Sequence, residues 1–147
     1  MTILTLHAGE PAWDNVACFA ADCPWRAGAF LAELMRTNRF AEWERVFAAF
    51  DAESPIGFCT LTAKDEMPES CVYTPFIGFV YVDAAYRGRR ISEQMIAAAS
   101  DYAKSLGYTA VYLTSDEQGL YEKYGFELHG TVETAWHEMT QLFVKPL

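Results

Sequence analysis

The chain has 147 residues, 52% of them hydrophobic, and its 20 acidic side chains outnumber its 11 lysines and arginines, for a net charge of −9. This length and composition predict one domain over residues 1–147 with a single core. An acidic chain with one short basic cluster is not expected to bind nucleic acid, because phosphate backbones are bound by extended basic surfaces. The longest uncharged run, Ser70 to Val82, is interrupted by Pro75 and is too short to cross a membrane.

The N-terminal region lacks the positive flank of a signal peptide, since Arg26 is the first arginine or lysine. We therefore expect a cytoplasmic protein whose cysteines stay reduced. The spacing of the cysteines and histidines matches no metal-binding pattern, and we expect no metal. These residues are Cys18, Cys23, Cys59, Cys71, His7, His129 and His137.

The first half of the chain alternates between extended and helical patterns. Apolar and polar residues alternate over Thr2–His7, which predicts a strand, and Trp13–Ala21 is typical of a short helix. Helical spacing of apolar residues predicts a second helix over Arg26–Thr37. The runs Trp43–Phe50 and Ile56–Ala63 are separated by turn residues, so they predict an antiparallel hairpin.

The second half begins with a polar loop, Lys64–Ser70, before a predicted strand over Phe76–Val82. The amphipathic run Ile91–Leu106 predicts a helix that ends at Gly107. Four elements complete the chain: a strand Ala110–Leu113, a short helix Glu117–Tyr124, and strands Phe126–Val132 and Trp136–Val144.

A basic turn joins the strand that ends at Val82 to the helix that starts at Ile91. It contains Arg87, Arg89 and Arg90, three of the chain's eleven basic residues. A strand that empties into a helix start directs unpaired backbone N–H groups and the positive end of the helix dipole at one point. The sequence therefore predicts an anion site, although a solvated basic turn is the alternative interpretation.

The segments VDAAYRGRRIS, YLTS and GLYEKYGFE, in this order and separation, resemble the acetyl-coenzyme A core of the GNAT superfamily of N-acetyltransferases. The resemblance covers Pro75 to the C-terminus. It implies an α+β, three-layer fold with a mixed, mostly antiparallel sheet of about six to seven strands and helices on both faces. It also implies that the strands Phe76–Val82 and Ala110–Leu113 splay apart to admit the pantetheine chain.

The resemblance implies acetyl-coenzyme A as co-substrate and places Arg87 first in the phosphate-binding loop. Arg90 and Ser92 occupy the two positions where the superfamily has small residues, so their Cβ atoms could crowd a phosphate. Their amides can still donate if φ is negative, and we expect the Arg90 guanidinium and the Ser92 hydroxyl to add donors. The complete expected set is Val80, Tyr81, Val82, Arg87, Gly88, Arg89, Arg90, Ile91 and Ser92.

Tyr121 takes the position of the superfamily's general acid, so the resemblance implies that it protonates the leaving thiolate; packing in the core is the alternative. An acidic cavity would help to deprotonate an acceptor amine. Its candidate members are Asp65, Glu66, Glu69 and Asp116, with Tyr73 as a polar lining residue, and none is assigned as the base. Four aromatic residues could line an acceptor pocket or pack in the core: Trp13, Trp25, Phe40 and Trp43.

The leading hypothesis is an N-acetyltransferase that modifies a primary amine, in a small molecule or a peptide, by direct attack in a ternary complex. The acidic surface favours a cationic acceptor. A non-catalytic acyl-coenzyme A sensor is the alternative, and an unrelated nucleotide binder is disfavoured because both GxxxxGK[ST] and GxGxxG are absent. The oligomeric state stays open, with a homodimer as one option.

Overall fold

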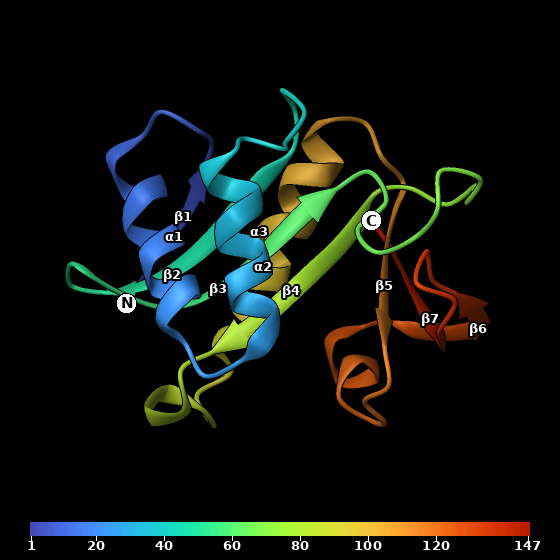
Figure 1. The fold of residues 1–147 in the computed structure, drawn as a ribbon. Coiled ribbons are helices and arrows are strands. Elements are labelled where there is room, and N and C mark those ends of the chain that lie inside the picture. Colours follow the sequence, from blue (N-terminus) through green and yellow to red (C-terminus); the bar gives the residue numbers. More distant parts are fainter.

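The computed structural model describes residues 1–147 and contains one seven-stranded sheet in the order β1-β2-β3-β4-β5-β7-β6. Helices α1 and α2 lie on one face of the sheet and α3 lies on the other, so the molecule has three layers (Figure 1). Only β4 and β5 pair in parallel. The strands are β1 Thr2–Leu6, β2 Arg45–Asp51, β3 Ser54–Thr62, β4 Phe76–Val82, β5 Ala110–Ser115, β6 Glu127–Glu133 and β7 Met139–Pro146. The helices are α1 Pro11–Asp22, α2 Arg26–Arg36 and α3 Ile91–Ser105, with 3-10 turns η1 Ala84–Tyr86 and η2 Tyr121–Tyr124.

The expected α+β fold is confirmed, and every predicted strand is present. Two predictions differ from the structure near the C-terminus. The helix expected over Glu117–Tyr124 is reduced to η2, because Gly119 has a φ of +83° and interrupts it. The last strand begins at Met139 rather than at Trp136, which lies in the turn after β6. No helix is both long and apolar enough to cross a membrane, and all four cysteines are free.

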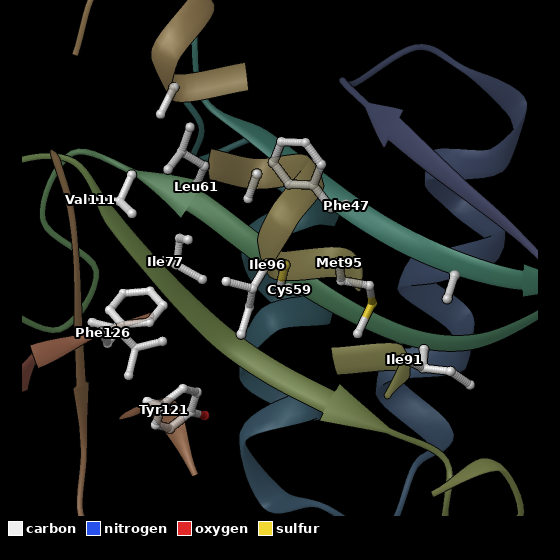
Figure 2. Packing of buried hydrophobic residues seen from close by; sticks show 14 of the residues in the cluster. Phe47, Cys59, Leu61, Ile77, Ile91, Met95, Ile96, Val111, Tyr121 and Phe126 are labelled. Atoms are coloured by element: carbon white, nitrogen blue, oxygen red, sulfur yellow. The ribbon is translucent and has the colours of Figure 1, made fainter. Parts of the chain in front are cut away.

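Two hydrophobic cores flank the sheet, because successive strand residues point to opposite faces. Phe47, Cys59 and Ile77 pack against α3, through residues such as Met95, as Figure 2 shows. A second core lies between the sheet and the helices α1 and α2. It contains Leu31, Met35, Val46, Phe58 and Tyr81.

The sheet opens between β4 and β5. These strands share a single bridge, Phe76 with Tyr112, and then diverge (Figure 1). Strand β5 instead pairs along its full length with β7. A bulge also bends β4, where the register with β3 shifts and Phe79 has a φ of +50°. The predicted splay is therefore confirmed.

Close contact between α1 and α2 fixes the position of α2 over β4. A Cβ at Gly28 of α2 would lie 2.4 Å from the carbonyl oxygen of Ala20 in α1. The two helices approach this closely only because position 28 has no side chain. The arrangement brings Trp25, just before this helix, and Phe30 within it against Phe79, with ring centroids 6.3 and 6.1 Å away.

We predict that Gly28→Ala destabilises the protein, because the new methyl group must push a backbone carbonyl away. Overpacking typically costs about 1–3 kcal/mol, and alanine's better helix propensity recovers at most about 1 kcal/mol. Urea unfolding followed by circular dichroism should show a net loss, whereas Ala29→Ser, at an exposed neighbour, should change the unfolding free energy by no more than about 0.5 kcal/mol. A Gly28→Ala variant as stable as the parent would show that the helices have room to separate.

Candidate active site

A large cleft lies where β4 leaves β5. Its volume is about 2020 Å³, and its walls come from α2, the β3–β4 loop, β4, the loop before α3, β5 and η2. Pockets for a single small molecule usually measure about 300–1,000 Å³. The cleft therefore has room for two substrates side by side.

Unpaired backbone amides surround the start of α3, at one end of the cleft. No amide from Gly88 to Glu93 donates a hydrogen bond within the protein, and the first helical bond runs from Gln94 N to Arg90 O, 3.2 Å apart. The helix has 15 residues, so its dipole adds positive potential at the same place. This cluster of donors, called here the amide cradle (88–93), is a geometry suited to a phosphate group.

Arg90 has a φ of +59°, in the left-handed region that favours glycine. The condition of a negative φ, expected from the sequence, is therefore not met, although the amide is free. The Arg90 guanidinium already has a partner in the protein, because its Nε and Nη2 donate to the two carboxylate oxygens of Glu93 at 2.7 and 2.8 Å. This contact lowers the pKa of Glu93.

Of the other side chains of the loop that were expected to bind phosphate, two already have hydrogen-bond partners in the protein. The Ser92 hydroxyl lies 2.8 Å from the Tyr124 hydroxyl, so this expected phosphate donor already has a partner. Arg87 folds back and donates from Nε to the Val82 carbonyl at 3.0 Å. The guanidinium of Arg89 lies over the Tyr86 ring, 5.1 Å from its centroid, and makes no hydrogen bond within the protein.

The open edge of β4 carries backbone groups that no strand satisfies. Tyr81 pairs with Phe58 of β3, and Asp83 N donates to Ile56 O at 2.8 Å. Ladder hydrogen bonds alternate along a strand, so Val80 and Val82 direct their N–H and C=O groups away from β3, toward the splay. Among the expected cofactor-binding residues, Val80 and Val82 thus face the opening, whereas the backbone of Tyr81 pairs with β3.

Tyr121 packs in the core, as the alternative interpretation expects, and it also lies at the wall of the cleft. Its ring contacts those of Tyr124, Phe126 and Phe143, and only 6% of the residue is exposed. Figure 2 shows its hydroxyl turned away from Phe126. Burial, followed by the charge of Glu117, raises the pKa of Tyr121 to about 12. The phenol is therefore protonated at every physiological pH.

Three of the four candidate carboxyl groups line the cleft: Asp65, Glu66 and Glu69. The fourth prediction is wrong, because Asp116 follows the end of β5 and turns toward β7, where it accepts a hydrogen bond from Thr140 at 3.1 Å. The prediction that Tyr73 lines the cavity is also wrong. Its ring is tilted by 35° to that of Tyr112, with centroids 4.9 Å apart, and its hydroxyl lies 3.3 Å from His129, outside the cleft lining.

The aromatic candidates divide between the cleft and the core. Trp25 and Phe40 line the cleft. Trp13 is buried, with its Nε1 donating to Met35 O, and Trp43 packs 5.7 Å from the Tyr108 ring. The sequence did not single out Phe30, Phe79, Trp136, Glu44 or Glu138, which also line the cleft.

Comparison with known proteins agrees with this geometry. The sequence profile of the Acetyltransferase (GNAT) family matches residues 13–126. No curated protein sequence matches the chain significantly.

Several solved structures share the fold across nearly the whole chain. The aminoglycoside 6'-N-acetyltransferase from Enterococcus faecium has 17% identity and a TM-score of 0.73, over 99% of this chain and 97% of that one. The GNAT protein YhbS from Escherichia coli, in complex with CoA, has 18% identity and a TM-score of 0.70, over 99% and 80%. A GNAT acetyltransferase from Elizabethkingia anophelis with acetyl-CoA bound has 18% identity and a TM-score of 0.66, over 99% and 97%. The family profile spans more than half of the chain and the fold agrees with it, so this protein belongs to the GNAT family of acetyltransferases.

Proposed function

We propose that this protein is an N-acetyltransferase that transfers the acetyl group of acetyl-coenzyme A to a primary amine by direct attack in a ternary complex. The observation that carries the proposal is the amide cradle (88–93) beside the open edge of β4. The similar folds from E. coli and E. anophelis hold CoA and acetyl-CoA, which supports this choice of co-substrate.

The residues of the cleft fit such a co-substrate. In this proposal the amides from Gly88 to Glu93 bind the diphosphate, and Arg89 supplies mobile positive charge. Gly88 has a φ of +83° and open space on its side-chain side, so a phosphate can approach the backbone there. The outward-facing backbone groups of Val80 and the N–H of Val82 pair with the pantetheine chain as a neighbouring strand would, while the Val82 carbonyl accepts from Arg87.

Tyr121 is the proposed donor to the leaving thiolate, as the resemblance implied. Full proton transfer from a phenol of pKa about 12 to a thiolate of pKa about 8.5 is uphill by about 5 kcal/mol. Transfer must therefore accompany cleavage of the C–S bond, and the phenol's steady contribution is a hydrogen bond to the developing negative charge on sulfur.

The acceptor half of the cleft favours a cationic amine. Its glutamates outnumber its cations, so the net negative charge concentrates ammonium groups. The glutamates are Glu44, Glu66, Glu69 and Glu138, and the cations are Arg26, Arg39 and Lys64. Three of the similar solved structures are aminoglycoside 6'-acetyltransferases. We propose a small cationic amine as the acceptor, with a peptide amine as the second class to test.

The proposal is tested by measuring thiol release from acetyl-coenzyme A against a panel of amines. The panel includes an aminoglycoside, spermidine and a short peptide that contains lysine. Saturable release with at least one amine is expected. Coenzyme A binding without release above background from any amine would identify a sensor instead.

Replacing Arg89 should weaken coenzyme A binding without disturbing the fold, because its guanidinium has no hydrogen-bond partner in the protein. We expect Arg89→Ala to raise the dissociation constant by about 10- to 100-fold, and Arg87→Ala to do so as well. Isothermal titration calorimetry with coenzyme A measures both. Arg36→Ala, on the exposed surface of α2, is the matched control. Dissociation constants that do not move would exclude the amide cradle as the diphosphate site.

Tyr121→Phe should lower kcat by about 10²-fold or more while the dissociation constant of coenzyme A stays unchanged. Since the acidic form is the active one and its pKa is about 12, Tyr121 should cause no loss of wild-type activity on the alkaline side up to about pH 10. Steady-state kinetics from pH 6 to 10 test both points, with Tyr108→Phe as the control outside the cleft. Wild-type kcat in Tyr121→Phe would show that the residue only packs.

A further inference from the structure

A carboxylate occupies the place of a missing strand side chain in the middle of the cleft. Ile77 of β4 belongs to the α3-side core, so the next residue, Gly78, faces the α1–α2 side. A Cβ at Gly78 would lie 2.2 and 2.7 Å from the two carboxylate oxygens of Asp65. The loop between β3 and β4 therefore folds back and lays the Asp65 carboxylate directly on β4, next to the bulge at Phe79.

A buried polar group without a partner lies beside it. Thr60 of β3 is opposite Gly78 in the ladder, so its side chain faces the same side of the sheet. Its hydroxyl is fully buried and makes no hydrogen bond. The Asp65 carboxylate beside it forms no ion pair and bonds to no other side chain, and the backbone N–H of Glu66 is the donor that stabilises its charge. Buried polar groups are nearly always paired, so an unpaired hydroxyl next to a carboxylate without a counter-ion indicates a place for a cationic ligand.

The charged neighbours of Asp65 are held by other partners or stand apart from it. Glu66 accepts a hydrogen bond from Thr114 at 2.8 Å, and the Lys64 amino group donates to the carbonyls of Cys71 and Tyr73. Burial, and then the negative charge of Glu66, raise the pKa of Asp65 to about 7. The remaining charged groups of this part of the cleft are Arg26, Arg39, Glu44, Glu69 and Glu138.

We propose that Asp65 is the general base of the acyl transfer, and that Thr60 orients the amine by accepting a hydrogen bond from it. This proposal rests on the function proposed above. The acceptor arrives as an ammonium ion, gives one proton to the Asp65 carboxylate and attacks the thioester carbon as a neutral amine. The C–N bond forms and the C–S bond breaks. The proton that the nitrogen loses on forming the amide balances the one that the sulfur gains, and Asp65 returns its proton to solvent.

The base and the acid lie on opposite faces of the sheet. Tyr121 belongs to the α3-side core, whereas Asp65 lies on the α1–α2 side, and both line the same cleft. The amine therefore enters from beneath α2, the thioester lies on the α3 side, and the two meet where β4 and β5 separate. The sheet thus separates the two groups, so that no proton passes directly from Tyr121 to Asp65.

Asp65→Asn tests the proposal, because asparagine keeps the shape and cannot accept a proton from an ammonium ion. We expect kcat/KM for the best amine of the panel to fall by about 10²- to 10³-fold, with coenzyme A affinity unchanged. The wild-type profile should rise with pH through a limb near pH 7, and the variant should lack that limb. Glu127→Gln, which removes an exposed carboxylate of β6 outside the cleft lining, should keep both the rate and the limb.

Melting temperature separates this role from a structural one. A carboxyl group whose pKa rises from 3.8 to about 7 on folding favours the folded state least above pH 7, where it must be buried as an anion. Asp65→Asn should therefore melt several degrees higher than the parent at pH 8, and the difference should vanish below about pH 4.

The outcomes distinguish this proposal from the proposed function. An Asp65→Asn variant with the parent's rate and pH limb would overturn the assignment of the base and leave the acetyltransferase in place. A Glu127→Gln variant with the larger loss would do the same. A wild-type protein that binds coenzyme A and acetylates no amine would overturn both.

Discussion

The separation of β4 from β5 is the constraint on which the rest of this structure depends. After the single bridge between Phe76 and Tyr112, one edge of β4 has no neighbouring strand. Unpaired backbone groups away from water are costly, so an open edge inside a sheet persists only where surrounding contacts enforce it. Here β5 is drawn away by its full ladder with β7, and β4 is held by β3 and by the core against α3. The opening is thus part of the fold.

The same opening creates two environments from one cleft. On the α3 side it ends at the amide cradle (88–93), a region of fixed donors and positive helix potential. On the α1–α2 side it is lined by carboxyl groups and by the rings of Trp25, Phe30 and Phe79. Low dielectric acts on both sides, since burial is the first cause of the raised pKa of Tyr121 and of Asp65. Burial keeps the phenol protonated and brings the carboxyl group into the neutral range.

Local pattern was sufficient for the elements and for the basic turn. Periodicity located α2, α3 and the strands to within a few residues, and strand-turn-helix chemistry located the amide cradle. It was insufficient wherever a residue's role depends on a distant segment. The direction of Phe79 depends on a bulge set by the register with β3, and the position of Asp65 depends on a loop that folds onto Gly78. Asp116 is a further example. Its position at the end of β5 suggested that it lines the cleft, but its side chain turns toward the neighbouring strand β7.

Arg90 shows how a loop can keep its shape without the residue that usually provides it. Glycine would adopt a φ of +59° freely, but it would also let the ligand-free loop sample many other conformations. Arginine samples fewer conformations and adopts this one only at a steric cost, which its two hydrogen bonds to Glu93 offset by tying the turn to the first residues of α3. A ligand that meets a preorganised loop loses less conformational entropy in ordering it. Arginine at this position thus reduces the conformational freedom of the ligand-free loop and, with it, the entropy that binding must remove.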